Sequence, residues 1–221
     1  PTLYLTRADS DTLYSGGLQI RVQEGRTITF DGILGYVPSS ASQKGGTVTG
    51  SIALQFSNLF GTARKLSVRW FREVAMTQEV EVGYTEPWVA SAPLNASVKL
   101  WQRRQDSTYI RTRVDIVAEY MLTEEFSASG SFSVTTVHGI EGYGQRTIPQ
   151  SRATTFGVAV TYDTRNSIST PTEGFYYYTE YATGQKSQAA LSATPAVKNT
   201  MQRVVADGLY YQRIFSRQVL S

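Results

Sequence analysis

The feature that most constrains this chain is an alternation of apolar and polar residues, repeated in segments of about ten residues. From Ile110 to Tyr120 the even positions are Ile, Thr, Val, Ile, Ala and Tyr, whereas charged residues occupy most of the odd positions. A period of two is that of a β-strand with one apolar and one polar face. Similar segments lie at 47–56, 65–70, 79–84, 94–103, 126–134 and 156–162, with weaker ones at 175–183 and 202–212 and a further strand at 28–36 in front of them all.

The segments are joined by polar connections that contain Gly or Pro, and no window has a convincing helical period. The sequence therefore predicts an all-β, antiparallel up-and-down meander of about ten strands. Its apolar faces point inward in a soluble sandwich or lipocalin-like barrel, and outward in a transmembrane β-barrel. Strand length favours the membrane, because soluble strands average about five or six residues whereas tilted transmembrane strands need about nine to eleven.

The placement of charges and aromatic residues supports the same interpretation. The apolar faces of the second to eighth segments carry no charge, whereas the polar faces predict a wet lumen with ion pairs formed by Arg69, Glu79, Glu81, Arg113 and Asp115. Long connections at 38–46, 138–152 and 184–199 all leave from one end. An interfacial aromatic girdle is predicted at the other end, from Phe56, Tyr84, Tyr120, Phe126 and Tyr162. We therefore expect the long connections to be extracellular and the short turns periplasmic.

Composition excludes most enzyme classes. The chain has no Cys, so it has no disulfide, thiolate metal site or cysteine nucleophile, and its single histidine, His138, leaves only one candidate base. We interpret His138, in the Gly-rich stretch 138–144, as a solvated loop residue, and Lys44, Lys186 and Lys198 as solubilising loop charges. The net charge of +3 is too small to indicate a nucleic-acid partner. We predict no enzymatic activity, no cofactor and no metal. A mean hydropathy of −0.25 does not argue against a barrel, because only every second strand residue faces lipid.

Five short motifs follow one another in the order found in a known family. They are Val22-Gln23-Glu24-Gly25, Asp31-Gly32-Ile33-Leu34-Gly35-Tyr36, Asn58-Leu59-Phe60-Gly61-Thr62-Ala63-Arg64, Tyr84-Thr85-Glu86-Pro87-Trp88, and Asp163-Thr164-Arg165 followed by Pro171-Thr172-Glu173-Gly174. Together they resemble the barrel domain of the outer-membrane assembly factors, the BamA and TamA group also called bacterial surface antigens. The chain departs from the family pattern in Ala63, and it lacks both the R-G-F/Y motif and an aromatic-ended last strand.

The resemblance implies that this chain is a fragment of a sixteen-strand barrel in the outer membrane of a Gram-negative bacterium. Residues 1–27 would be the tail of a periplasmic POTRA-type domain, and 28–221 the first part of the barrel. The implied function is insertion or translocation of client proteins through a weak barrel seam. Implied partners are outer-membrane lipid, unfolded client proteins and periplasmic lipoproteins or chaperones.

The resemblance also implies roles for individual residues. The client-strand seam would comprise Ile28, Phe30, Gly32, Leu34, Gly35 and Tyr36. The turn motifs contribute Asn58, Phe60, Gly61, Arg64, Glu86, Pro87, Trp88, Asp163, Arg165, Pro171 and Gly174. Two other functions remain open: a passive outer-membrane porin or secretion pore, and a soluble β-sheet binding domain.

Overall fold

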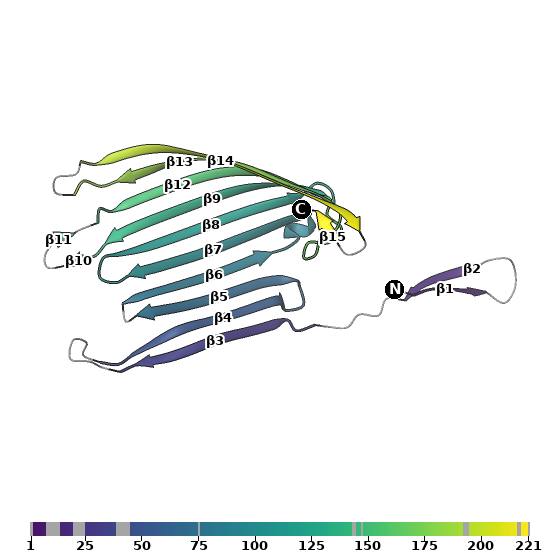
Figure 1. Ribbon diagram of the computed structural model, residues 1–221, viewed down its shortest axis with the longest axis horizontal. Coiled ribbons are helices and arrows are strands. Elements are labelled where there is room, and N and C mark those ends of the chain that lie inside the picture. The colour runs from purple at the N-terminus through teal and green to yellow at the C-terminus, as the bar shows by residue number, and fades with distance from the viewer. Residues whose placement is uncertain are drawn as a thin grey trace.

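One long antiparallel sheet dominates the computed structural model, which describes residues 2–7, 14–19, 25–38, 45–74, 76–142, 145–146, 148–191, 195–215 and 218–220 (Figure 1). Its strands are β3 (Ile28–Val37), β4 (Thr47–Leu59), β5 (Arg64–Val74), β6 (Thr77–Glu86), β7 (Leu94–Gln105), β8 (Tyr109–Met121), β9 (Phe126–Gly139), β12 (Ser151–Asp163), β13 (Gly174–Gln188), β14 (Val197–Phe215) and the short β15 (Gln218–Leu220). Two separate small hairpins are β1 (Thr2–Arg7) with β2 (Tyr14–Gln19), and β10 (Glu141–Gly142) with β11 (Gln145–Arg146).

Each strand of the long sheet pairs antiparallel with its neighbour in the chain, so the spatial order equals the sequence order. The predicted fold class, an all-β up-and-down barrel fragment, is confirmed, and the ten main strands are ten to nineteen residues long. The one helical element in the described part of the chain is a 3-10 turn, η1 (Val89–Ser91). No helix among the described residues has the length and hydropathy needed to span a bilayer.

The sheet is a single layer whose two faces differ in chemistry. Val114 lies opposite Leu100 and Val134, and Ile116 lies opposite Val98 and Phe132, so the apolar positions of neighbouring strands form continuous rows. Among the described residues only two hydrophobic side chains are buried, those of Ala159 and Ala182, while large apolar side chains are exposed along the outer, convex face. So much exposed apolar surface suits lipid rather than water.

The predicted girdle runs obliquely to the hydrogen-bonded rows. Phe56 and Tyr84 share one row through Leu66, and successive pairings carry that row across the sheet to Phe156 on β12. The girdle residue of β12 is Tyr162, which lies farther along the same strand toward the turn. A girdle that stays level in the membrane while the pairing rows climb is the stagger that tilted barrel strands require.

Backbone approach near the first strand depends on one glycine. Gly50 on β4 pairs with Leu34 on β3 and has a φ of +136°. A Cβ at this position would collide with the carbonyl oxygen of Ile33, so only glycine permits the two backbones to lie this close.

The predicted limits of the long connections were wrong at two places. His138 belongs to β9, Lys186 to β13 and Lys198 to β14, and the described part of the Gly-rich stretch ends β9 and forms β10, which pairs with β11. The end from which the long connections leave also has tight connections at 75–76 and 106–108. The opposite end has longer ones at 87–93 and 164–173. The difference between the two ends is therefore smaller than predicted.

Charges at the strand ends explain these errors. Arg72, Arg104 and Arg152 occupy apolar-face positions at the long-connection end, and Arg64 and Glu86 do so at the other. The expectation of an uncharged apolar face therefore holds only for the middle of the strands. Where both faces become polar, the period of two fades and the sequence no longer marks the end of a strand. Lys44 and the motif residues Val22–Glu24 lie outside the described residues.

The outward position of Val114 predicts the cost of charging it. We expect Val114→Arg to destabilise the folded barrel by about 2–4 kcal/mol, because the guanidinium would face the bilayer midplane. The control is Val117→Arg on the same strand, which faces the polar side opposite Ser97 and Ser131 and should cost less than about 1 kcal/mol. Urea unfolding in vesicles measures both. Equal costs would contradict the assignment of the two faces.

Candidate functional site

The first candidate site is the free edge of β3. In the described part of the chain β3 pairs with β4 along its whole length and has no partner on its other edge. All ten of its residues are exposed, and Ile33 reaches 74%. An unpaired edge presents backbone N–H and C=O groups that can accept another strand.

The register of β3 divides the residues of the predicted seam between its two faces. Five of them face the apolar side with their β4 partners: Ile28, Phe30, Gly32, Leu34 and Tyr36. Gly35 alternates with them and lies on the opposite face, where it pairs with Thr49. Gly32, Gly35 and Gly50 remove the cross-strand side-chain contact from their three pairs, which weakens the attachment of β3 to β4 in the middle of the strand.

Two of the predicted turn motifs meet in space at the other end of the sheet. Arg64 donates to both carboxylate oxygens of Glu86, from Nε at 3.0 and 2.7 Å and from Nη2 at 2.9 Å. Tyr84 donates its hydroxyl proton to the same carboxylate. The pair is about one-third exposed, and its two-pronged geometry fixes the orientation of both side chains. This contact was not predicted, although the hairpin register places Arg64 and Glu86 across from one another.

The turn that precedes Arg64 is held by local hydrogen bonds. The side-chain oxygen of Asn58 accepts a bond from the Ala63 amide at 2.7 Å, and the Thr62 hydroxyl donates to the Leu59 carbonyl at 2.7 Å. Phe60 has a φ of +56° and is 89% exposed. In the next turn at this end, after Pro87, Trp88 also has a positive φ of +52°. Both turns hold a large aromatic residue in a costly left-handed conformation, with the side chain exposed.

The third motif closes the connection between β12 and β13. Arg165 donates to both oxygens of Asp163, at 2.8 and 2.6 Å, and lies over the ring of Tyr176. The hydrogen bond to Asp163 raises the pKa of Arg165 above its ordinary value, so the guanidinium stays charged. Asn166 then accepts bonds from the amides of Thr172 and Glu173. Gly174 ends the segment with a φ of +117°, while Pro171 lies inside it.

Ion pairs cross the polar, concave face from β5 to β8. Arg69 pairs with Glu81 at 4.0 Å, and Arg113 contacts Asp115 on its own strand at 2.8 Å. Glu79 lies 3.8 Å from Arg103 rather than beside Arg69. Lys99 forms a second ion pair with Glu81, with 3.8 Å between its Nζ and a carboxylate oxygen. Lys99 and Arg103 were not among the predicted residues, although their alternation on β7 places them on this face.

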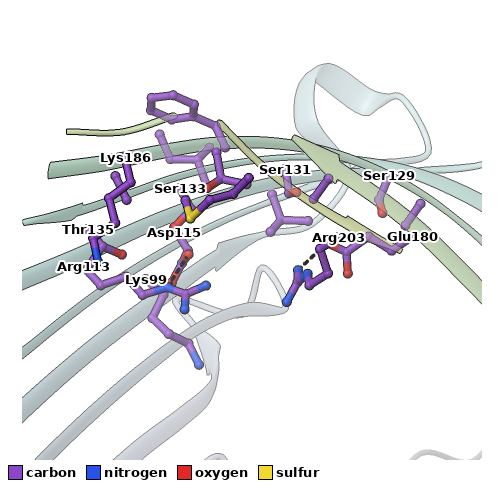
Figure 2. Close-up of a pocket in the computed structure, with 18 of the residues that line it drawn as sticks. Lys99, Arg113, Asp115, Ser129, Ser131, Ser133, Thr135, Glu180, Lys186 and Arg203 are labelled. Atoms are coloured by element: carbon purple, nitrogen blue, oxygen red, sulfur yellow. Dashed lines mark hydrogen bonds and ion pairs between the residues drawn. The ribbon is translucent and has the colours of Figure 1, made fainter. Parts of the chain in front are cut away.

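Beside these pairs the concave face contains a hollow of about 710 Å³ (Figure 2). Small residues of β9, β12 and β13 form its floor, including Ser129, Ser131 and Ala159. Lys99, Arg113, Lys186 and Arg203 stand around it, and Arg203 is held by Glu180 at 2.5 Å. Among the charged side chains that line the hollow cations outnumber carboxylates, and apolar side chains such as Phe132 and Met201 line the rest of it.

The family comparison agrees with this geometry. Residues 58–221, from the Asn58 turn to the end of the chain, match the family model of the Omp85 superfamily domain. This chain belongs to the Omp85 superfamily. The resemblance to the BamA and TamA group is thus confirmed at the level of the superfamily. No curated protein matches the chain. Omp85 proteins are non-enzymatic assembly and transport factors of outer membranes in Gram-negative bacteria and organelles.

The close packing around Gly174 gives a prediction for this Omp85 chain. A Cβ at Gly174 would lie 2.5 Å from the Thr164 carbonyl oxygen and 2.7 Å from the Arg165 Cα, besides requiring a positive φ. We expect Gly174→Ala to destabilise the barrel by more than about 1 kcal/mol. Gly130→Ala is the control, because a Cβ there meets nothing within 4 Å. The melting temperatures of the two variants are measured by thermal unfolding on gels. Equal melting temperatures would contradict the close packing at Gly174.

Proposed function

We propose that this chain is the first part of the barrel of an outer-membrane protein that inserts or translocates client proteins. In this proposal β3 forms a weak seam with a closing strand, and the seam opens so that the β3 edge templates an incoming client strand. The observation that carries the proposal is the β3 edge itself, paired on one side only in the described residues and interrupted by Gly32 and Gly35.

The chemistry required of the chain is hydrogen bonding rather than covalent catalysis. A client strand entering the membrane must pair its backbone groups, because each unpaired group in lipid costs several kcal/mol. The β3 edge offers those partners in a fixed register, and the exposed side chains of Ile28, Phe30 and Leu34 offer an apolar face continuous with the lipid. We propose accordingly that no cofactor takes part, and that the partners are lipid, unfolded clients and periplasmic lipoproteins or chaperones.

The turns at the end with Arg64 and Glu86 support a periplasmic position for that end. They lie beside the aromatic girdle, and the three longest connections at the opposite end, 38–46, 140–150 and 189–196, suit the cell surface. Residues 1–27 would then belong to a periplasmic POTRA-type domain on the same side as these turns.

Locking the seam tests the proposed mechanism. In the full-length protein, a disulfide between Cys placed at Ile33 and Cys on the closing strand should stop client insertion into vesicles while the barrel stays folded. The matched control locks the other edge of the same strand with Ile33→Cys and Ser51→Cys, since these residues already face one another in the β3–β4 register. This control should insert clients at the wild-type rate.

The outcomes of the seam lock separate the candidate functions. Normal insertion with the seam locked would overturn the templating mechanism. A passive pore would instead keep its conductance under the same lock and would have no client activity to lose. Restoration of insertion on reduction excludes irreversible damage by the crosslink.

Topology is tested separately. Protease added to intact cells should cut a cleavage site inserted in the 140–150 connection and should spare one inserted in the 60–63 turn. The reason is that these two connections leave from opposite ends of the strands. Disruption of the outer membrane should expose the second site, which shows that the site itself is cleavable. The reverse pattern in intact cells would invert the proposed orientation.

A further inference from the structure

The outer surface of the barrel has a feature that the seam mechanism does not use. We propose that it binds the phosphate groups of membrane lipids through an outer basic band, formed by Arg104 on β7, His138 on β9, Arg152 on β12 and Lys198 on β14. All four side chains are exposed. The band lies at the end of the sheet from which the long connections leave (Figure 1). The proposal rests on the barrel spanning a membrane and not on the seam.

Pairing in the sheet places the four residues on the lipid-facing side. Arg152 has the same parity on β12 as the exposed Phe156, Val158 and Tyr162. Ser187 on β13 pairs with both Arg152 and Lys198, so these two cations share one row. Ile110 on β8 pairs with His138 and also with Arg104. Because directly paired residues share a face, the whole band points outward.

Strand geometry places the band at the level of the lipid head groups. On β12 there are ten residue steps from the girdle residue Tyr162 to Arg152. At about 3.4 Å per residue and a tilt of 35–45°, they rise roughly 24–28 Å, close to the apolar height of about 25 Å in such barrels. Leu94, which pairs with the girdle residue Tyr120, lies ten steps from Arg104, and the girdle residue Phe126 lies twelve steps from His138. Gly208 shares the row of Tyr162 through Tyr177 and lies ten steps from Lys198. The band therefore lies at the far border of the apolar belt, opposite the girdle.

The sign of the charge on this surface is uniform. On β3 to β9 and β12 to β14, every carboxylate whose side chain the structure describes faces the concave side except that of Glu86, which lies at the girdle end and is paired with Arg64. Arg72 on β5 also faces outward. At the level of the band, the outward strand positions therefore carry cations and no carboxylate, so the surface selects an anion.

The chemistry of the band matches lipid phosphates. Guanidinium and ammonium groups bind phosphate oxygens through charge-assisted hydrogen bonds, and their long stems can lie along the acyl chains. Arg152 and Lys198 are separated by two strand spacings, or roughly 10 Å, and the Ser187 hydroxyl between them donates to the Arg152 carbonyl oxygen at 3.4 Å. A head-group phosphate at this row would meet a cation on either side.

The test compares lipid retention by two double variants of the full-length protein. The band variant is Arg152→Gln with Lys198→Gln, and the control is Arg111→Gln with Lys186→Gln. Arg111 lies on β8 and Lys186 on β13, near the same end of the sheet as the band. Both residues face the concave side. The proteins are reconstituted in phosphatidylcholine vesicles that contain a small fraction of either lipid A or phosphatidylglycerol. After extraction in mild detergent, the bound phosphate-bearing lipid is counted by native mass spectrometry.

We expect wild type and the control to retain the phosphate-bearing lipid. The band variant should retain at most about one-tenth of the wild-type amount, because two surface cations are lost. Retention of lipid A or of phosphatidylglycerol each supports the proposal, and the lipid retained identifies the source of the phosphate. Equal retention by the band variant and wild type would overturn it, as would an equal loss in the control. Client insertion in pure phosphatidylcholine is measured in parallel, so a failed seam mechanism and a failed lipid site give different results.

Discussion

Backbone hydrogen bonding in a solvent that cannot supply it is the constraint on which the rest of this structure depends. Inside a bilayer the N–H and C=O groups of a strand must be paired by neighbouring strands. From β4 to β13 every strand of the long sheet is paired on both edges, and in the described residues β3 is paired on one. The groups that make an open edge costly in lipid are the same groups that would hold a client strand. The demand for closure and the proposed activity therefore have one physical origin.

The difference in polarity between the two faces also follows from the single-layer sheet. With only Ala159 and Ala182 buried among the apolar residues described, the wall has no hydrophobic core of its own, so lipid must supply the apolar contacts. The charged side chains therefore lie in two regions. Most point inward, where Glu81 lies between Arg69 and Lys99. The remainder lie at the ends of the outward rows, where the strands leave the apolar layer.

How much the sequence predicted depends on how local each signal is. The period of two from Ile110 to Tyr120 sets the faces of a strand without reference to any neighbour, so the strands and the fold class could be predicted. The Arg69–Glu81 opposition followed from one hairpin. The same hairpin register places Arg64 opposite Glu86, a pair that was missed because both residues lie on the face expected to carry no charge. The Arg103–Glu79 pair depends on the register between β6 and β7, which periodicity alone leaves open. Strand ends such as His138 and Lys186 were missed because polar residues on both faces there remove the alternation.

The ion pairs of the concave face contribute to specificity more than to stability. They are partly exposed, and such pairs are worth about 0–1 kcal/mol each. A slip of one residue between β5 and β6, however, would turn Arg69 or Glu81 toward lipid, which is far more costly. A slip of two residues keeps the faces and still offers Glu79 to Arg69, so the ion pairs cannot prevent it. The connection at 75–76 opposes it instead, because Val74 pairs with Thr77 and a slip of two residues would have to re-form the turn one residue along the chain. Charge thus selects the face, and the turn selects the register.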